Sequence, residues 1–231
     1  AAASVSKQLV VALPSPITRA ANGVTIQYTP SSIDSEPKFI QANPRGAPQS
    51  EWFAVVTNAS KAQITSYAMN VPAGITYFTP PLQSNPVPFN NIVTSLMMNM
   101  SYMFENATTF NADISSWDIS KVTVMDWMFA TAEAFNNNGS PYIGSWDTSK
   151  VRAMNGVFYS AKEFNQNIGS WDTALVTIMT YMFYGATKFN QDISGWNVAI
   201  TPARTGLNIN QFAIASPLAL PENSAKLPLF Q

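Results

Sequence analysis

The 231-residue sequence contains neither cysteine nor histidine. Without cysteine, the chain can form neither disulfide bonds nor thiolate metal sites. Without histidine, a Ser-His-Asp triad, a Cys-His dyad and the common zinc sites are all excluded. The sequence also has no glycine-rich phosphate-binding loop. Catalysis by carboxylates alone is not excluded by these absences.

Charge is scarce as well. Charged residues make up 11% of the chain and the net charge is −1, whereas an average soluble domain is about 25% charged. No cluster of lysine and arginine offers a footprint for nucleic acid, and no apolar run approaches the ~20 residues that span a bilayer. The sequence therefore predicts a folded protein with a neutral polar surface, no nucleic-acid partner and no membrane span.

What the sequence does contain is a block of roughly 25 residues that repeats four times. Three kinds of residue keep the same step: tryptophan, the Phe-Asn pair and methionine. They are Trp117, Trp146, Trp171 and Trp196; Phe110-Asn111, Phe135-Asn136, Phe164-Asn165 and Phe189-Asn190; and Met100, Met125, Met154 and Met179. The middle step is longer, and the excess lies in residues 137–142, where Gly, Pro and Asn predict an inserted surface loop.

Each repeat combines two kinds of spacing. Ile-x-x-Trp-x-(Ile/Thr/Val) has the spacing of a leucine-rich-repeat strand, and Met-x-x-Met-Phe-x-x-Ala-x-x-Phe has the i, i+3, i+4, i+7 spacing of a short helix or a pair of helical turns. One strand and one helical piece per unit predict an α/β solenoid of about four leucine-rich-repeat-like coils, in which stacking buries the aromatic residues. This solenoid is expected to span residues 89–200.

The flanking segments lack the repeat. Residues 1–88 are predicted to form a β-rich capping or docking domain, with strands at 24–28, 52–56 and 64–69 and frequent prolines between them. Residues 5–13 are apolar enough to be an edge strand of this domain or an arm that pairs with a neighbour. Residues 201–231 are expected to be an irregular C-terminal cap or tail, because an open stack exposes its core at both ends.

The repeats resemble a known family. Residues 110–118 read FNADISSWD, residues 164–173 read FNQNIGSWDT, and Met-x-x-Met-Phe recurs between such segments. These motifs are similar to the BspA-like leucine-rich repeats, also described as the mycoplasma-type surface lipoprotein repeat. The preceding segments at 39–44, 51–56 and 88–94 resemble leaders of such proteins in large DNA viruses. Two departures are Val157, in place of a methionine, and Asn197, in place of an aspartate. The resemblance implies a surface-exposed or secreted binding or structural protein and carries over no catalytic residue.

Two rows of polar residues are candidate sites. The asparagines of the Phe-Asn pairs are expected to stack as a ladder that bonds backbone groups of neighbouring coils, with ligand binding as the alternative. If the tryptophans point inward, the next residue of each strand points outward. That second row is Asp118, Asp147, Asp172 and Asn197.

Aligned carboxylates repel one another, and three readings of the second row remain open. Each aspartate can accept a hydrogen bond from its own turn, two rungs can share a Ca²⁺ ion, or the row can face a polar ligand, a glycan or a protein. The equivalence of the positions argues against a glycosidase, because a catalytic acid and base need different environments. No metal or cofactor is assigned.

The inserted loop supplies the remaining candidates, Asn137, Asn138 and Tyr142, and Asn138 is also a candidate acceptor for N-glycosylation. We therefore expect a non-enzymatic, surface-exposed structural or adhesive protein, extracellular or on a cell or virion surface, that contacts a protein partner or assembles with itself. The alternatives are a virion component, such as an outer capsid or fibre protein, and a glycan-binding module.

Overall fold

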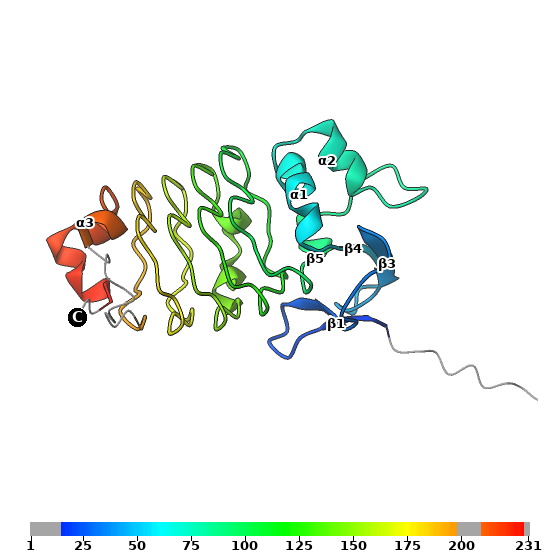
Figure 1. Cartoon of the computed structure of the whole chain (residues 1–231), viewed down its shortest axis with the longest axis horizontal. Coiled ribbons are helices and arrows are strands. Elements are labelled where there is room, and N and C mark those ends of the chain that lie inside the picture. The colour runs from blue at the N-terminus through cyan, green and yellow to red at the C-terminus, as the bar shows by residue number, and fades with distance from the viewer. Residues whose placement is uncertain (1–14, 198–208, 229–231) are drawn as a thin grey trace, which may run out of the picture.

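The computed structural model describes residues 15–197 and 209–228. Strands and helices gather at the N-terminal end, irregular turns of chain lie side by side in the middle, and short helical pieces follow at the C-terminal end (Figure 1). We call residues 94–197 the repeat segment. The strand or arm expected at residues 5–13 lies outside the described residues.

Two small sheets form in the N-terminal part. Strand β1 (Ile17–Arg19) pairs antiparallel with β2 (Ile26–Tyr28). Strand β3 (Lys38–Ala42) pairs antiparallel with β4 (Glu51–Val55), and β4 pairs in parallel with β5 (Ile92–Val93). The strands expected near 24–28 and 52–56 are therefore present. Because β5 leads directly into the repeat segment, the second sheet joins the two parts of the chain.

The expectation of a strand at 64–69 is wrong. Residues Lys61–Ala68 form helix α1, which follows the 3₁₀ helix η1 (Asn58–Ser60) and precedes α2 (Pro72–Tyr77). The apolar pair that decides the matter is Ile64 and Ala68, both buried: residues four apart lie on one face of a helix. The N-terminal part is therefore a mixture of strands and helices, not a β-rich domain.

Glu36 ties the start of β3 to η1. Its carboxylate accepts hydrogen bonds from the Thr57 backbone N–H at 2.9 Å and the Thr57 hydroxyl at 2.7 Å, and from the Ser60 hydroxyl. Burial acts to raise the pKa of Glu36, but the hydrogen bonds from Ser60 and Thr57 outweigh it, and the net pKa lies below the usual value of 4.5. The folded state therefore favours the ionised carboxylate.

A pH-dependent contribution to stability follows. Because the pKa of Glu36 is lower in the folded than in the unfolded chain, its contribution is present above the unfolded pKa and is lost as the pH falls through the folded pKa. Glu36→Gln should lower the melting temperature at pH 7, and the difference from the parent should shrink as the pH falls below about 4. A difference that stays constant down to pH 2 in thermal melts would contradict this assignment.

The α/β solenoid expected from the repeats is also wrong. Over residues 15–197 and 209–228 the chain forms one sheet of two strands, one of three strands and few helices. Within residues 94–197 the described chain consists of turns and bends, three isolated parallel bridges and two 3₁₀ helices, η3 (Asn137–Gly139) and η4 (Pro141–Ser145). The bridges join Asn99 to Val124, Val124 to Ala153 and Ala153 to Ile178.

The backbone hydrogen bonds explain why no helix forms. In the Met-Phe part of each repeat, alternate N–H groups donate to the next repeat, as Met100 does to Val124 at 3.0 Å and Phe104 does to Met128 at 2.8 Å. Others close short turns within the repeat, such as Ala107 N–H to Phe104 at 3.1 Å. Because backbone donors must be paired when buried, these bonds replace the helical ones.

The apolar period that suggested a helix comes from successive turns of the chain. Every third or fourth residue points inward, but left-handed backbone conformations separate them, with φ of 60° at Tyr102 and at Asn106. Equivalent positions in later repeats also have positive φ: Trp127, Thr131, Gly156, Ser160, Tyr181 and Gly185. An α-helix needs negative φ throughout, so the same spacing has a different backbone.

Aromatic side chains form columns along the interior of the repeat segment. Within each repeat two phenylalanines stack, as Phe129 and Phe135 do at 4.0 Å between ring centroids. Between repeats the rings stack again, as Phe129 does on Phe158 at 5.5 Å and a 1° interplanar angle. The four repeat tryptophans are all buried, as the sequence predicted. Burying one such side chain stabilises the fold by about 1.5–3 kcal/mol, so the columns dominate the core.

Both ends of the phenylalanine column are covered. At the N-terminal end, Phe89 of η2 (Phe89–Asn91) contacts Phe110 at 5.0 Å and stacks on Tyr67 of α1 at 4.3 Å. At the C-terminal end, Phe212 of α3 (Ile209–Phe212) lies edge-on to Phe183 at 5.3 Å. The 3₁₀ helices η6 (Pro217–Ala219) and η7 (Pro221–Lys226) complete that end, where Lys226 accepts a backbone bond from Ile193 at 2.9 Å.

The asparagine ladder is confirmed. The side-chain oxygen of Asn111 accepts the backbone N–H of Asn136 at 2.8 Å, and the next two rungs repeat the bond at 2.9 and 3.0 Å. Lys226 takes the place of a further rung and donates to the Asn190 side chain at 2.9 Å. Each amide thus pairs a backbone donor that the turn would otherwise leave open.

Breaking one rung tests the ladder. Asn136→Ala should lower the free energy of unfolding by about 1–3 kcal/mol, because the N–H of Asn165 loses its acceptor. The matched control is Asn85→Ala, an exposed asparagine outside the repeats, which should change stability by less than about 0.5 kcal/mol. Chemical denaturation of both variants measures the difference, and equal midpoints would count against the ladder.

Candidate functional site

The row of aspartates bonds to its own turns. Asp118 accepts the backbone N–H of Ser120 at 3.1 Å, and Asp172 accepts that of Ala174 at 2.9 Å. Asp147 accepts both the backbone N–H of Ser149 at 3.1 Å and its hydroxyl at 2.6 Å. These are the local side-chain-to-backbone bonds of Asx turns. They confirm the prediction that each aspartate accepts a hydrogen bond from its own turn.

The row is not one uniform surface. Asp118 is buried, with 5% of its surface exposed, whereas Asp147, Asp172 and Asn197 are exposed. Among the described residues, no group of three or more acidic side chains could hold a metal ion.

The sequence did not reveal a third ladder, made of threonines two residues after the tryptophan position. The buried hydroxyls of Thr94 and Thr148 each donate to the backbone carbonyl of the residue after the next tryptophan, Asp118 and Asp172, at 2.9 Å. The alternation Trp-Asp-Thr contained the signal, but Ile119 and Val198 replace the threonine in two of the four repeats. Buried hydroxyls of this kind stabilise the stack when they are paired.

The inserted loop is partly structural. Asn137 is fully buried: its side-chain oxygen accepts the N–H of Ile114 at 2.9 Å, and its amide donates to Ser115 and Ser140, both at 2.9 Å. It is not accessible to a partner. Asn138 is exposed, with φ of 51°, and Tyr142 has 52% of its surface exposed. Of the three predicted loop residues, two can touch a partner.

The loop borders a groove of about 950 Å³. The tip of the β1–β2 hairpin contributes Asn22 and the loop contributes Pro141, while the floor comes from equivalent corners of three successive repeats. The corner residues are small or polar: Gly144 and Ser145, Gly169 and Ser170, Ser194 and Gly195, with Asn167, Gln191, Asp192 and Trp146 beside them. The sequence did not predict this groove, because its two walls lie more than a hundred residues apart.

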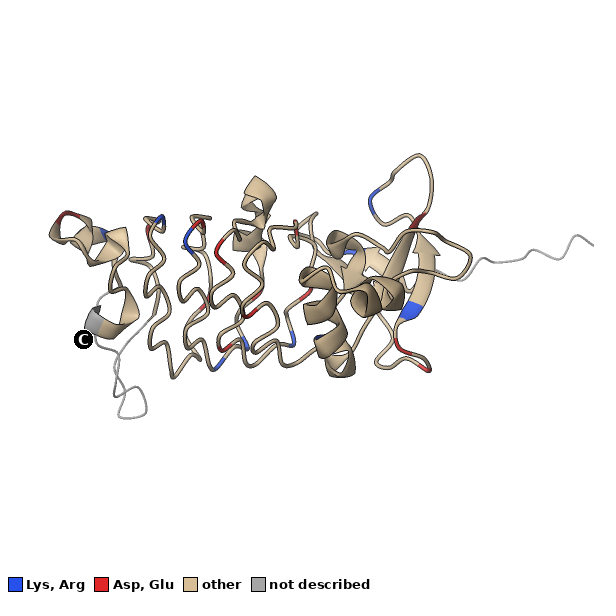
Figure 2. Cartoon of the chain, turned by 90° about the horizontal axis from the view of Figure 1, so that it is seen from above, with Lys and Arg blue, Asp and Glu red and all other residues tan. Residues whose placement is uncertain are grey.

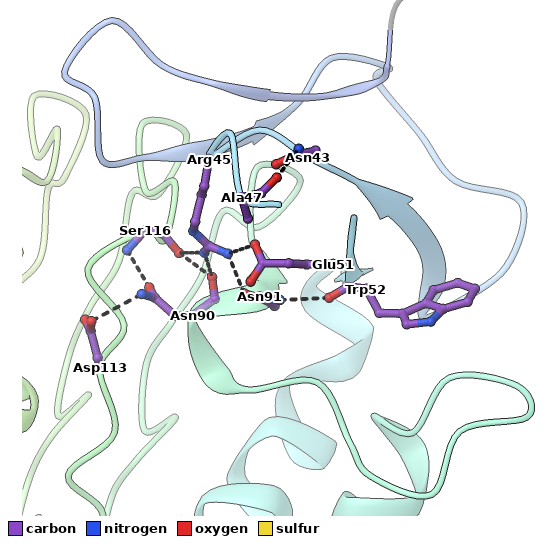
Figure 3. Close-up of polar contacts among 9 residues, drawn as sticks. All are labelled: Asn43, Arg45, Ala47, Glu51, Trp52, Asn90, Asn91, Asp113 and Ser116. Carbon is purple, nitrogen blue, oxygen red and sulfur yellow. Dashed lines mark hydrogen bonds and ion pairs between the residues drawn. The ribbon is translucent and has the colours of Figure 1, made fainter. Parts of the chain in front are cut away.

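Arg45 lies between β3 and β4 and bonds to several segments next to this region. Its guanidinium donates to Glu51 at 2.8 Å, to the Asn91 side chain at 2.7 Å and to the Asn90 carbonyl at 2.6 Å (Figure 3). Asn90 in turn accepts the backbone N–H of Ser116 at 2.8 Å. Because these partners come from the N-terminal sheet, η2 and the first repeat, the arginine joins the two parts of the chain and is held by its own contacts.

Electrostatics elsewhere is sparse and local. Acidic and basic residues are scattered along the chain (Figure 2). Two ion pairs connect neighbouring repeats, Glu133 to Lys162 and Glu163 to Lys188, at 2.7 and 2.5 Å. Both pairs are half-exposed, so each contributes little to stability. No charged patch marks the groove.

The insertion also leaves one donor unpaired. The indole N–H of Trp171 donates to Ile143, and that of Trp196 donates to Ile168, both at 3.1 Å. The indole N–H of Trp146 is buried and has no partner among the described residues. By the same pattern its acceptor would be a backbone carbonyl of the preceding repeat. The four extra residues of the insertion move the Trp146 indole away from that carbonyl.

Glycines make the close approach of the corners possible. A Cβ on Gly144 would lie 2.4 Å from the Asn167 carbonyl oxygen, and one on Gly169 would lie 2.5 Å from that of Asp192. A Cβ on Gly195 would meet nothing within 4 Å. Backbone atoms cannot yield as a flexible side chain can, so the first two positions require glycine.

The corners give a paired prediction. Gly144→Ala should destabilise the fold by about 1–3 kcal/mol, the cost of overpacking, and should lower the melting temperature by several degrees. Gly195→Ala, the matched control at an open corner, should leave the melting temperature unchanged or raise it. Calorimetry on both variants decides the matter: equal shifts would mean that the corners are not packed as described.

Comparison with known proteins identifies the repeats. A sequence model of the family described as "Mycoplasma protein of unknown function, DUF285" matches twice, over residues 82–142 and 138–205. No curated protein and no solved structure matches the chain. No helix in residues 15–197 and 209–228 has the length and apolar character needed to cross a membrane.

Proposed function

The chain belongs to this mycoplasma repeat family, and we propose that it is a non-enzymatic, surface-exposed structural or adhesive protein that contacts a protein partner through its repeats. The proposal includes the finer assignment to the BspA-like surface type and an extracellular location. The observation that carries it is the groove of about 950 Å³ between the hairpin tip and the repeat corners. Such a groove suits an extended segment of a partner.

The lining favours contact by shape and hydrogen bonds. Each of the three corners contributes a serine to the floor, at the equivalent position in Ser145 and Ser170, so successive residues of an extended chain meet similar groups. The repeat aspartates bond to their own turns and thereby keep the corners in place. With only 11% charged residues, association depends little on electrostatic steering.

The inserted loop can make the contact specific for one partner. Tyr142 lies beside the groove with half of its surface exposed and lines the neighbouring hollow with Arg19 and Asn22. Tyrosine is among the residues that carry binding energy at protein interfaces. The insertion is therefore the feature that distinguishes this surface from a regular repeat.

A test of the proposal begins with location. Antibodies against the repeat segment should label intact producing cells or particles as strongly as permeabilised ones. The purified chain should also bind to these intact surfaces, and Ser145→Trp should weaken that binding at least about tenfold, or ~1.4 kcal/mol, because Ser145 lines the groove.

The control places the same bulk elsewhere. Thr109→Trp changes an exposed residue that does not line the groove, and its binding should equal that of the parent. Labelling that appears only after permeabilisation would refute surface exposure. Equal binding by Ser145→Trp and the parent would show that the groove is not the contact.

A further inference from the structure

A row of aromatic side chains follows a different stretch of each repeat. Tyr102, Trp127 and Tyr181 occupy one equivalent position, two residues after the buried methionine, and Gly156 occupies it in the remaining repeat. Tyr159 and Tyr184 follow three residues later in the last two repeats. Tyr102 has 50% of its surface exposed, and the others are half-buried. We call these five aromatic residues the aromatic face.

The backbone at this position disfavours aromatic residues. The φ angles of Tyr102, Trp127 and Tyr181 are 60°, 57° and 59°, in the left-handed region that bulky residues rarely adopt. Gly156, with φ of 52°, shows the residue that suits this conformation. Strain of this kind persists where the side chain serves a further purpose, and the turn itself does not require a ring.

Gly156 also lets the rings meet across the repeats. The Trp127 ring lies 2.4 Å from where a Cβ on Gly156 would be, and its centroid is 6.3 Å from that of Tyr181, two repeats away. Tyr159 contacts Trp127 at 5.5 Å and stacks on Tyr184 at 5.1 Å. The rings of Trp127, Tyr159, Tyr181 and Tyr184 therefore form one continuous surface across the position of Gly156, which has no side chain.

Polar residues come directly before the aromatic position in three repeats. Asp126, Asn155 and Thr180 directly precede the aromatic position and are half-exposed. The Oδ1 atoms of Asp126 and Asn155 accept backbone N–H groups of the next repeat at 2.8 and 3.2 Å. The second polar atom of each, Asp126 Oδ2 and Asn155 Nδ2, makes no hydrogen bond within the described chain. Each side chain is thus held in place by its Oδ1 atom, and its second polar atom can pair with a ligand.

We propose that the aromatic face binds a neutral polysaccharide. The apolar C–H face of a pyranose ring packs against an aromatic ring, while carboxylate and amide groups pair with its hydroxyls. The aromatic face with its polar row contains one charged residue, Asp126, which suits a neutral polymer better than a charged one. Equivalent positions in successive repeats offer equivalent contacts to a repeating polymer. This activity adds to the proposed protein contact and does not depend on the groove.

The experiment is native gel electrophoresis of the full chain in gels that contain soluble β-glucan, α-glucan or mannan. At least one polysaccharide should retard the parent, and Trp127→Ala should bind it at least about tenfold more weakly, or ~1.4 kcal/mol. Tyr102→Gly should also weaken binding, yet its melting temperature should equal or exceed that of the parent, because glycine relieves the left-handed backbone. A ring needed only for folding would give the opposite change in melting temperature.

The matched control is Leu175→Ala, which removes an exposed apolar side chain of the repeat segment outside the aromatic face and should be retarded like the parent. Absence of retardation in all three gels would overturn the proposal, and so would equal retardation of Trp127→Ala and the parent. Loss of retardation in Leu175→Ala alone would place the site away from the aromatic face and overturn the proposal as well. If the parent binds no polysaccharide but still binds intact source surfaces in a Ser145-dependent way, this inference fails and the proposed function stands.

Discussion

Stacking of phenylalanine rings from one repeat to the next is the interaction on which the rest of the structure depends. The rings lie nearly parallel, as Phe135 does over Phe164 at 6.0 Å and 2°, and the column continues into both ends of the chain through Phe89 and Phe212. A single repeat exposes its rings on both sides, so it cannot be stable alone. The column sets the spacing at which all backbone and side-chain ladders then form.

The ladders divide the polar residues into two groups. Buried and half-buried groups, such as the Asn136 amide and the Thr148 hydroxyl, pair with backbone atoms of the next repeat. Repeated aspartates such as Asp147 pair within their own turn. Polar residues that repeat in register are therefore mainly structural here. The surfaces proposed to bind depart from the regular repeat: the inserted loop with its groove, and the aromatic residues at positions that suit glycine.

The two proposed surfaces use different chemistry. The groove presents small hydroxyl and amide groups above a floor that glycines bring close together, which suits an extended chain. The aromatic face presents wide apolar rings with a few polar atoms beside them. Both lie on a chain of low charge, so specificity on either surface depends on fit and hydrogen bonding. A repeat protein can present both because each repeat contributes several exposed positions.

The sequence alone determined the repeat, its break at residues 137–142, the inward tryptophans and the asparagine ladder, because each depends on a spacing that is written in the chain. It did not determine the local backbone. Met-x-x-Met-Phe-x-x-Ala has the spacing of a helix, but left-handed residues such as Tyr102 and hydrogen bonds to the next repeat give turns instead. For the same reason the sequence could not show that Asn137 and Asp118 are buried. The groove and the contact of Trp127 with Tyr181 exist only in the tertiary structure, because stacking brings together residues whose separation in the chain gives no local signal.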